Sequence, residues 1–147
     1  MNIRPMMKKD KDKVVEMMRG FYDSPAVIHK VPDEVLSKDV EDCIGECPFI
    51  EGVVFEEEEA VAGYAMMAKS YSTEFGGICI WIEDIFIRPE FQGKGIGSTF
   101  FHYLEESYKG IAVRYRLEVA KDNLNAIKVY EKNGYEVLDY MEMTKEI

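Results

Sequence analysis

The chain has 147 residues, of which 18 are Lys or Arg and 28 are Asp or Glu, so its formal net charge is −10. This charge argues against nucleic acid as a partner and suits a small cationic ligand. A hydrophobic content of 47% is enough for one core, and we expect a single domain over residues 1–147. Because no apolar run has the length of a membrane span and residues 1–13 lack a signal-peptide core, we expect a cytoplasmic protein without a membrane partner.

Three cysteines, Cys43, Cys47 and Cys79, lie in the chain without Cys-x-x-Cys spacing and without a nearby histidine. An odd number in this arrangement supports neither a disulfide framework nor a zinc site. We therefore expect free thiols and no bound metal.

Hydrophobic periodicity in the first half of the chain predicts a strand, two amphipathic helices and a hairpin. In chain order these segments are residues 2–5, 8–22, 32–47, 49–55 and 60–69. The second helix begins with Pro32-Asp33-Glu34, a proline and two acids that suit a first helical turn. The four glutamates at 56–59 are typical of a solvated turn between the hairpin strands.

Residues 78–87 form an almost continuous apolar run, which is typical of a strand covered on both faces. Glu83 and Asp84 interrupt this run, and carboxylates are costly to bury unless they are paired or line a ligand site. The pair is therefore the first sign of chemistry. The preceding turn, which begins at Tyr71, carries hydroxyls and a carboxylate that we expect near the same site.

A glycine-rich loop follows this strand, with the sequence Gln92-Gly93-Lys94-Gly95-Ile96-Gly97-Ser98. Its three glycines allow backbone N–H groups to converge where a helix begins, and such an arrangement binds anions. A P-loop is excluded, because Lys94 is followed by Gly95 and no glycine stands at the required distance before it. The run also fits the dinucleotide-binding fingerprint poorly, because its glycines alternate and no acidic strand end follows.

The remaining segments alternate between helix and strand. In order they are a helix at 96–108, a strand at 113–119, a helix at 123–132 and two closing strands at 135–138 and 140–146. In the first of these strands the polar face carries Arg114, Arg116 and Glu118, and we expect the glutamate to pair with the arginines.

Gln92, Gly95 and Gly97 resemble the pyrophosphate loop of the GNAT superfamily of acetyl-CoA-dependent N-acetyltransferases, whose pattern is Gln/Arg-x-x-Gly-x-Gly/Ala. The run from Asn123 to Tyr135 resembles the second signature of this superfamily, Asn-x-x-Ala-x-x-x-Tyr-x-x-x-Gly-Phe/Tyr. The resemblance implies an α/β (α+β) fold with a mixed, mostly antiparallel sheet of about six to seven strands, flanked by about four helices.

The resemblance also implies acetyl-CoA as the cosubstrate. Strand amides would hold its pantetheine arm together with Asn123, and the glycine loop would hold its pyrophosphate with help from Lys94. The implied acetyl-CoA-binding residues are Ile85, Phe86, Ile87, Gln92, Gly93, Lys94, Gly95, Ile96, Gly97, Ser98, Asn123 and Ala126.

The run Ile82-Glu83-Asp84-Ile85 looks most like the diamine and polyamine N-acetyltransferases, which carry an adjacent Glu-Asp pair on this strand. The implied reaction is direct transfer of acetyl to a primary amine of a small cationic substrate in a ternary complex. Because an alkylammonium is neutral in only about one part in a thousand at pH 7, a base is required. We expect Glu83 to be this base, Asp84 and Tyr71 to contact the substrate, and Tyr130 to protonate the leaving thiolate.

Two questions about this site stay open at the level of the sequence. Neighbouring residues of a regular strand face opposite ways, so Glu83 and Asp84 share a pocket only if the strand is bulged. Glu118 occupies the Leu-Glu-Val position of the proposed base in some protein N-terminal acetyltransferases of the superfamily, and it is the second candidate for the base.

The same resemblance leaves two other functions open and suggests one assembly state. The chain would act on proteins or peptides if it offered an open groove, or it would be a non-catalytic acetyl-CoA sensor. The sensor is disfavoured because Glu83 and Tyr130 are both present. Dimers are common in the superfamily, and a homodimer would form through the two closing strands.

Overall fold

The computed structural model describes residues Met1–Ile147 and contains five strands, four α-helices and two 3-10 helices. The strands are β1 (Asn2–Pro5), β2 (Ile50–Glu57), β3 (Ala60–Ser72), β4 (Gly77–Ile87) and β5 (Ala112–Leu117). The α-helices are α1 (Lys11–Tyr22), α2 (Asp33–Ile44), α3 (Ile96–Ser107) and α4 (Leu124–Lys132), and the 3-10 helices are η1 (Lys8–Asp10) and η2 (Pro89–Phe91). Up to Lys132, the elements expected from the sequence are confirmed in type and order.

The five strands form one mixed sheet in the order β1-β2-β3-β4-β5. The first four pair antiparallel, and β5 pairs parallel with β4. A parallel neighbour requires a crossover connection, which α3 provides between the two strands. The mixed, mostly antiparallel sheet and the four helices are therefore as expected.

The number of strands is lower than the six to seven expected, because the two closing strands do not form. Residues 135–147 contain no strand, and β5 has no neighbour on its outer side. Val137, Met141 and Met143 are each 89% exposed, although their spacing is that of a strand with one apolar face. The pattern was present, but a strand also needs a partner for its backbone hydrogen bonds.

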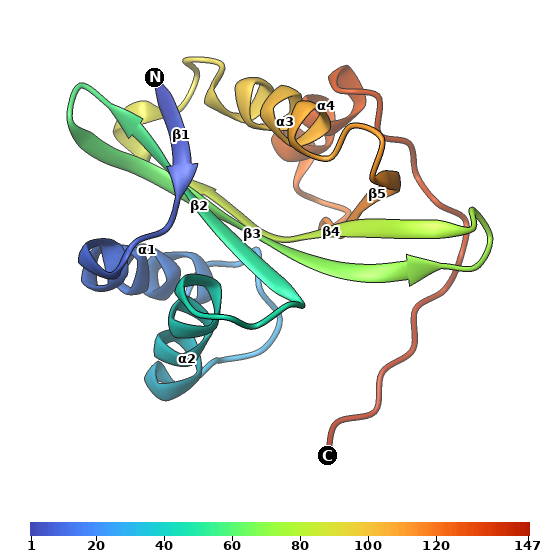
Figure 1. Cartoon of the computed structure of the whole chain (residues 1–147), viewed down its shortest axis with the longest axis horizontal. Coiled ribbons are helices and arrows are strands. Elements are labelled where there is room, and N and C mark those ends of the chain that lie inside the picture. Colours follow the sequence, from blue (N-terminus) through green and yellow to red (C-terminus); the bar gives the residue numbers. More distant parts are fainter.

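The sheet separates two helical layers, with α1 and α2 on one face and α3 and α4 on the other (Figure 1). One hydrophobic cluster joins the sheet to α3 and includes Phe100, Phe101 and Leu104. The other joins it to α1 and α2 and includes Met18, Leu36 and Tyr64. The longest helices have 12 residues and none is apolar enough to cross a bilayer.

Candidate active site

Strand β4 is bulged at Glu83. Ile82 pairs with Met67 and Asp84 pairs with Met66, so Glu83 is an extra residue with no partner on β3. Before the bulge Ile80 and Ile82 belong to the cluster under α3, whereas after it Ile85 and Ile87 pack against that cluster. The inward face thus changes from even to odd residues across Glu83, which is the effect of a one-residue insertion in a strand. The bulge required for a shared pocket is confirmed.

Asp84 lies in the layer between the sheet and α1, where it is 4% exposed. The hydroxyl of Tyr22, the last residue of α1, donates to its Oδ1 at 2.8 Å, and the hydroxyl of Tyr64 on β3 donates to its Oδ2 at 3.0 Å. Burial raises the pKa of Asp84, and the two hydroxyls act in the opposite direction. No cationic side chain lies within 4.0 Å of this carboxylate. Neither tyrosine was identified as a site residue from the sequence.

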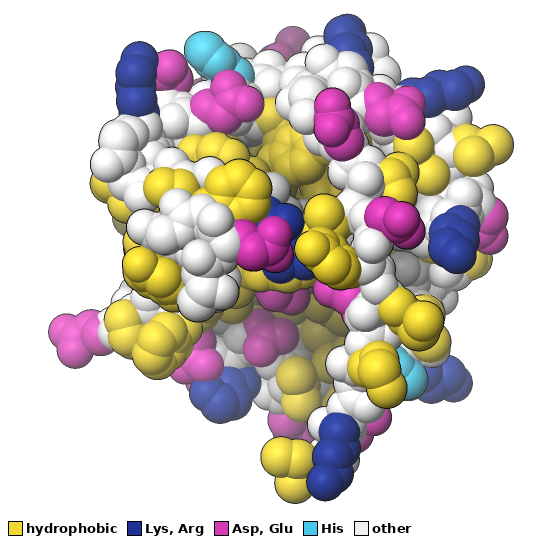
Figure 2. Space-filling view, turned by 90° about the vertical axis from the view of Figure 1, so that its right-hand side faces the viewer, with side chains coloured by type: hydrophobic (Ala, Val, Ile, Leu, Met, Phe, Trp, Pro, Cys, Tyr) yellow, Lys and Arg dark blue, Asp and Glu magenta, His cyan; other side chains and the backbone are white.

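Glu83, the residue before Asp84, is exposed. Its pKa is raised, mainly by partial desolvation and next by the charge of Asp84, with smaller effects from Glu118 and Asp39. Figure 2 shows a hollow on the face that carries the β3–β4 turn and the C-terminal segment, with acidic and basic side chains around it. A carboxylate whose pKa is raised by desolvation and by a neighbouring charge is suited to accept a proton.

Glu118 follows Leu117, the last residue of β5, and Leu117 pairs with Ile82. Glu83 and Glu118 therefore directly follow the paired residues Ile82 and Leu117 on two neighbouring strands. The expected pairing of Glu118 with the arginines is wrong, because neither arginine forms an ion pair with it. Arg114 lies over Phe75 and 3.7 Å from Glu74, and Arg116 lies over Trp81. The pKa of Glu118 is raised, first by burial and next by Glu142.

Beyond the bulge, β4 has a free edge on the side of β5. Pairing with β5 ends at Ile82, and residues 83–87 have no β5 neighbour. The N–H of Arg88 donates to Ala62 on β3, so the backbone groups of Ile87 and Ile85 point to the other side, since they alternate along a strand. The Nε2 of Gln92 donates to the carbonyl of Ile87 at 3.0 Å. The amides of Ile85 and Ile87 thus remain for a ligand, and Phe86 packs on the opposite face.

The glycine loop enters α3 with Gly93 and Gly95 in the left-handed region, at φ values of 75° and 78°. A Cβ at either position would meet no protein atom within 4 Å, so backbone conformation and not crowding selects glycine here. The side chain of Ile96 is 3% exposed and packs in the core, which leaves its backbone amide for a ligand. The ammonium of Lys94 lies 5.0 Å from the ring centre of Phe91. These groups fit the diphosphate of a nucleotide-type cosubstrate.

Helix α4 presents the second group of expected residues. The Oδ1 of Asn123 caps this helix by accepting from the N–H of Ala126 at 3.3 Å, and its Nδ2 has no partner. The Nδ2 of Asn133 donates to the Oγ of Ser98 at 3.2 Å and ties α4 to the first turn of α3. Tyr130 is half-buried against Phe101, and burial raises the pKa of its hydroxyl. It therefore remains a proton donor at neutral pH.

Tyr71 is not brought to Glu83 within this chain. It is 65% exposed and stands five residues along β3 from Met66, the partner of Asp84. At about 3.3 Å per residue this spacing corresponds to about 17 Å. The hydroxyls and the carboxylate of the 71–77 turn lie at the far end of the same hairpin.

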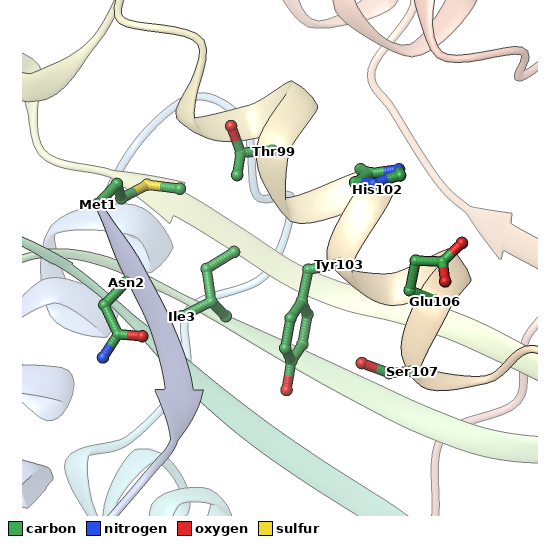
Figure 3. A pocket seen from close by; sticks show the side chains of 8 residues that line it. All are labelled: Met1, Asn2, Ile3, Thr99, His102, Tyr103, Glu106 and Ser107. Atoms are coloured by element: carbon green, nitrogen blue, oxygen red, sulfur yellow. The ribbon is translucent and has the colours of Figure 1, made fainter.

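A cavity of about 550 Å³ lies away from all these residues, between β1 and α3. Figure 3 shows the side chain of Ile3 on β1 next to that of Tyr103 on α3 at this cavity. No residue of the expected site lines this cavity. The candidate site is therefore the region of the bulge, the free edge of β4 and the glycine loop.

Comparison with known proteins identifies the family of this chain. Residues 11–135 match the acetyltransferase (GNAT) family. A thialysine N-epsilon-acetyltransferase of Bos taurus is 31% identical over 144 residues, covering 90% of this chain and 82% of the relative. A spermine/spermidine N(1)-acetyltransferase of Bacillus subtilis is 28% identical, covering 62% of each chain.

Solved structures share the fold. A possible acetyltransferase from Clostridium difficile superposes with a TM-score of 0.85 at 23% identity, covering 99% of this chain and 97% of that one. An aminoglycoside N-acetyltransferase solved with CoA gives a TM-score of 0.80 at 16% identity, covering 99% and 93%. The family match, the relatives and the fold agree: this chain belongs to the acetyltransferase (GNAT) family and is an acetyl-CoA-dependent N-acetyltransferase.

Proposed function

We propose that the enzyme moves acetyl from acetyl-CoA to a primary amine of a small cationic substrate by direct transfer in a ternary complex. The observation that supports a cationic substrate is the environment of Asp84, a buried carboxylate with two hydroxyl donors and no cationic partner. Buried charges in proteins are normally paired, and an ammonium group of the acceptor would supply the missing charge. The names of the thialysine and spermine/spermidine relatives agree with an amine acceptor.

In this proposal Glu83 takes the proton of the acceptor ammonium through a water molecule, and the neutral amine attacks the thioester carbonyl. The carbon–sulfur bond breaks, and the thiolate of CoA takes a proton from Tyr130. The thiolate is a fairly good leaving group, so Tyr130 contributes less than Glu83. Full turnover of a Tyr130→Phe variant, with chemistry rate-limiting, would assign Tyr130 to packing.

Direct transfer is favoured because Cys79, the cysteine on the strand that carries Glu83, is poorly suited to form an acetyl-enzyme. Cys79, the cysteine of β4, is 2% exposed, and burial raises the pKa of its thiol. Both features disfavour a reactive thiolate. The second candidate for the base remains Glu118, which lies next to Glu83 across the strands.

The amides of Ile85 and Ile87, with Phe86 between them, would bind the pantetheine arm of acetyl-CoA, and Asn123 would donate its free Nδ2 to it. The backbone from Gln92 to Ser98 and the ammonium of Lys94 would bind the pyrophosphate. Ala126 would border the site at the first turn of α4. No role for a metal enters this scheme.

The experiment that tests this function is free-thiol release from acetyl-CoA across a panel of amines. The panel contains spermidine, short diamines, lysine and thialysine, an aminoglycoside, and peptides with varied N-termini. We expect turnover with a small amine that carries a second positive charge, and little with its monoamine analogue. Turnover with peptides alone would establish the peptide alternative, and tight acetyl-CoA binding without turnover on any amine would favour a sensor.

We also propose that the enzyme is a homodimer in which the C-terminal segment of each chain pairs with β5 of the other. The outer edge of β5 is unpaired, and free edges are sites of strand addition. The segment after Lys132 runs past the body of the molecule and away from it (Figure 1). Its apolar side chains at 137, 141 and 143 are 89% exposed, and a partner strand would bury them.

A double variant, Met141→Lys with Met143→Lys, should convert the dimer to a monomer. Both side chains are 89% exposed within one chain, so lysine has little cost there unless a partner covers them. Light scattering should give a mass near twice 17.0 kDa for the wild type and near 17.0 kDa for the variant. Ile28→Lys, at a 93% exposed position between α1 and α2, is the matched control and should stay dimeric. A monomeric wild type, or a dimeric double variant, contradicts the proposal.

A further inference from the structure

The two tyrosines on Asp84 come from different elements and reach one carboxylate from two sides. Tyr22 is the last residue of α1 and Tyr64 lies in the middle of β3, where it is fully buried. Each hydroxyl donates to a separate oxygen, at 2.8 Å and 3.0 Å. Both Asp84 oxygens therefore accept a hydrogen bond, which also fixes the orientation of the side chain.

Asp84, whose carboxylate the two tyrosines hold, lies next to the bulge in β4. Asp84 is the residue immediately after Glu83, the unpaired extra residue of β4. Asp84 is anchored by the tyrosines below the sheet, and Ile82 is anchored in the opposite cluster by α3. The residues on both sides of Glu83 are therefore held by packing or hydrogen bonds.

We propose that Tyr22 and Tyr64 are positioning residues of the active site, which hold Asp84 as an oriented carboxylate beside Glu83 and thereby set the proton affinity of Glu83. The inference rests on the proposed role of Glu83 as the base. Neither tyrosine contacts the reacting atoms in this scheme. Tyr22 also links the α1–α2 layer to the strand that carries the base.

The sign of the effect follows from the groups that face this position. These are Tyr22 from α1, Asp39 and Cys43 from α2, Tyr64 from β3 and Glu118 after β5. Removal of a tyrosine hydroxyl raises the pKa of Asp84 further, because a hydrogen bond that favours its charged form is lost. A more protonated Asp84 repels the ionised Glu83 less, so the pKa of Glu83 falls toward its ordinary value.

The test is the pH profile of kcat/KM for Tyr22→Phe, measured on an accepted amine with the wild type alongside. Activity is lost as pH falls through the pKa of the base, and this acid limb should move to lower pH by roughly 0.5 to 1 in the variant. Asp84→Asn should move it the same way, and adding Tyr22→Phe to Asp84→Asn should move it no further. Tyr108→Phe, which removes a hydroxyl that donates to Glu51 far from the site, is the matched control and should leave the limb in place.

Three results would overturn the inference. The first is an acid limb in Tyr22→Phe and in Tyr64→Phe that coincides with the wild type, while Glu83→Gln abolishes it; the base then stands and only the positioning role fails. The second is an equal shift by Tyr22→Phe with and without Asp84→Asn, since the effect would not pass through Asp84. The third is an unchanged rate and profile in Glu83→Gln, which removes the proposed base and the positioning role together.

Discussion

Glu83→Gln is expected to lower kcat by about 10²- to 10⁴-fold on an accepted amine, which is the usual contribution of a general base. Glutamine keeps the size of the side chain and its exposure but cannot take a proton. The bulge places this side chain outside the regular alternation of β4, beside the buried Asp84. The measurement is steady-state thiol release at saturating acetyl-CoA and amine, with the pH profile recorded for both proteins.

The loss should not come from unfolding. The pKa of Glu83 is raised in the folded state, so the folded protein binds protons more tightly there than the unfolded chain. Stability from this group is then present at low pH and lost as pH rises through the raised pKa, and the ionised carboxylate opposes folding at neutral pH. We therefore expect the melting temperature of Glu83→Gln at pH 7 to equal or exceed that of the wild type.

Glu118→Gln is the matched comparison, because Glu118 follows the residue paired with Ile82 and its pKa is also raised. We expect this variant to keep most of the activity. A large loss in Glu118→Gln, with Glu83→Gln close to wild type, would transfer the role of the base to Glu118. Equal large losses in both would indicate that the two carboxylates share the proton.

Candidate site residues that lie close together in the sequence could be proposed from it. The Glu83-Asp84 pair stands out because carboxylates are costly in an apolar strand, and the glycine loop stands out because three glycines precede a helix. The sequence also indicated that a bulge is required if Glu83 and Asp84 share a pocket, since adjacent side chains of a regular strand face opposite ways. The structure adds where the extra residue lies, at Glu83.

Residues that meet through packing were not predictable. Tyr22 and Asp84 are 62 positions apart, and nothing in the helix predicted at 8–22 points to a contact with Asp84. Arg114 and Arg116 were expected beside Glu118, but both lie over aromatic rings of neighbouring segments. The prediction of two closing strands was wrong for another reason. The alternating pattern between 135 and 147 is typical of a strand, but no neighbouring strand in this chain accepts its backbone hydrogen bonds.

Gly95→Ala is expected to raise the KM for acetyl-CoA about tenfold or more, with a smaller effect on the KM for the amine. Gly95 is the N-cap of α3 at φ 78°, where an L-residue is strained by roughly 1–2 kcal/mol. A change of φ that relieves part of this strain turns the loop amides that are proposed to bind the phosphate. A loss of about 1.4 kcal/mol in phosphate binding corresponds to the tenfold change.

Gly76→Ala separates this effect from a general loss of stability. Gly76 has φ 67° in the β3–β4 turn, and a Cβ there also meets no atom within 4 Å, so the substitution has the same backbone cost far from the glycine loop. Both variants should lose similar melting temperature, and only Gly95→Ala should change the KM for acetyl-CoA. An unchanged KM in Gly95→Ala would mean that the loop amides do not bind the pyrophosphate, because the strain at this position acts on them before any other group of the site.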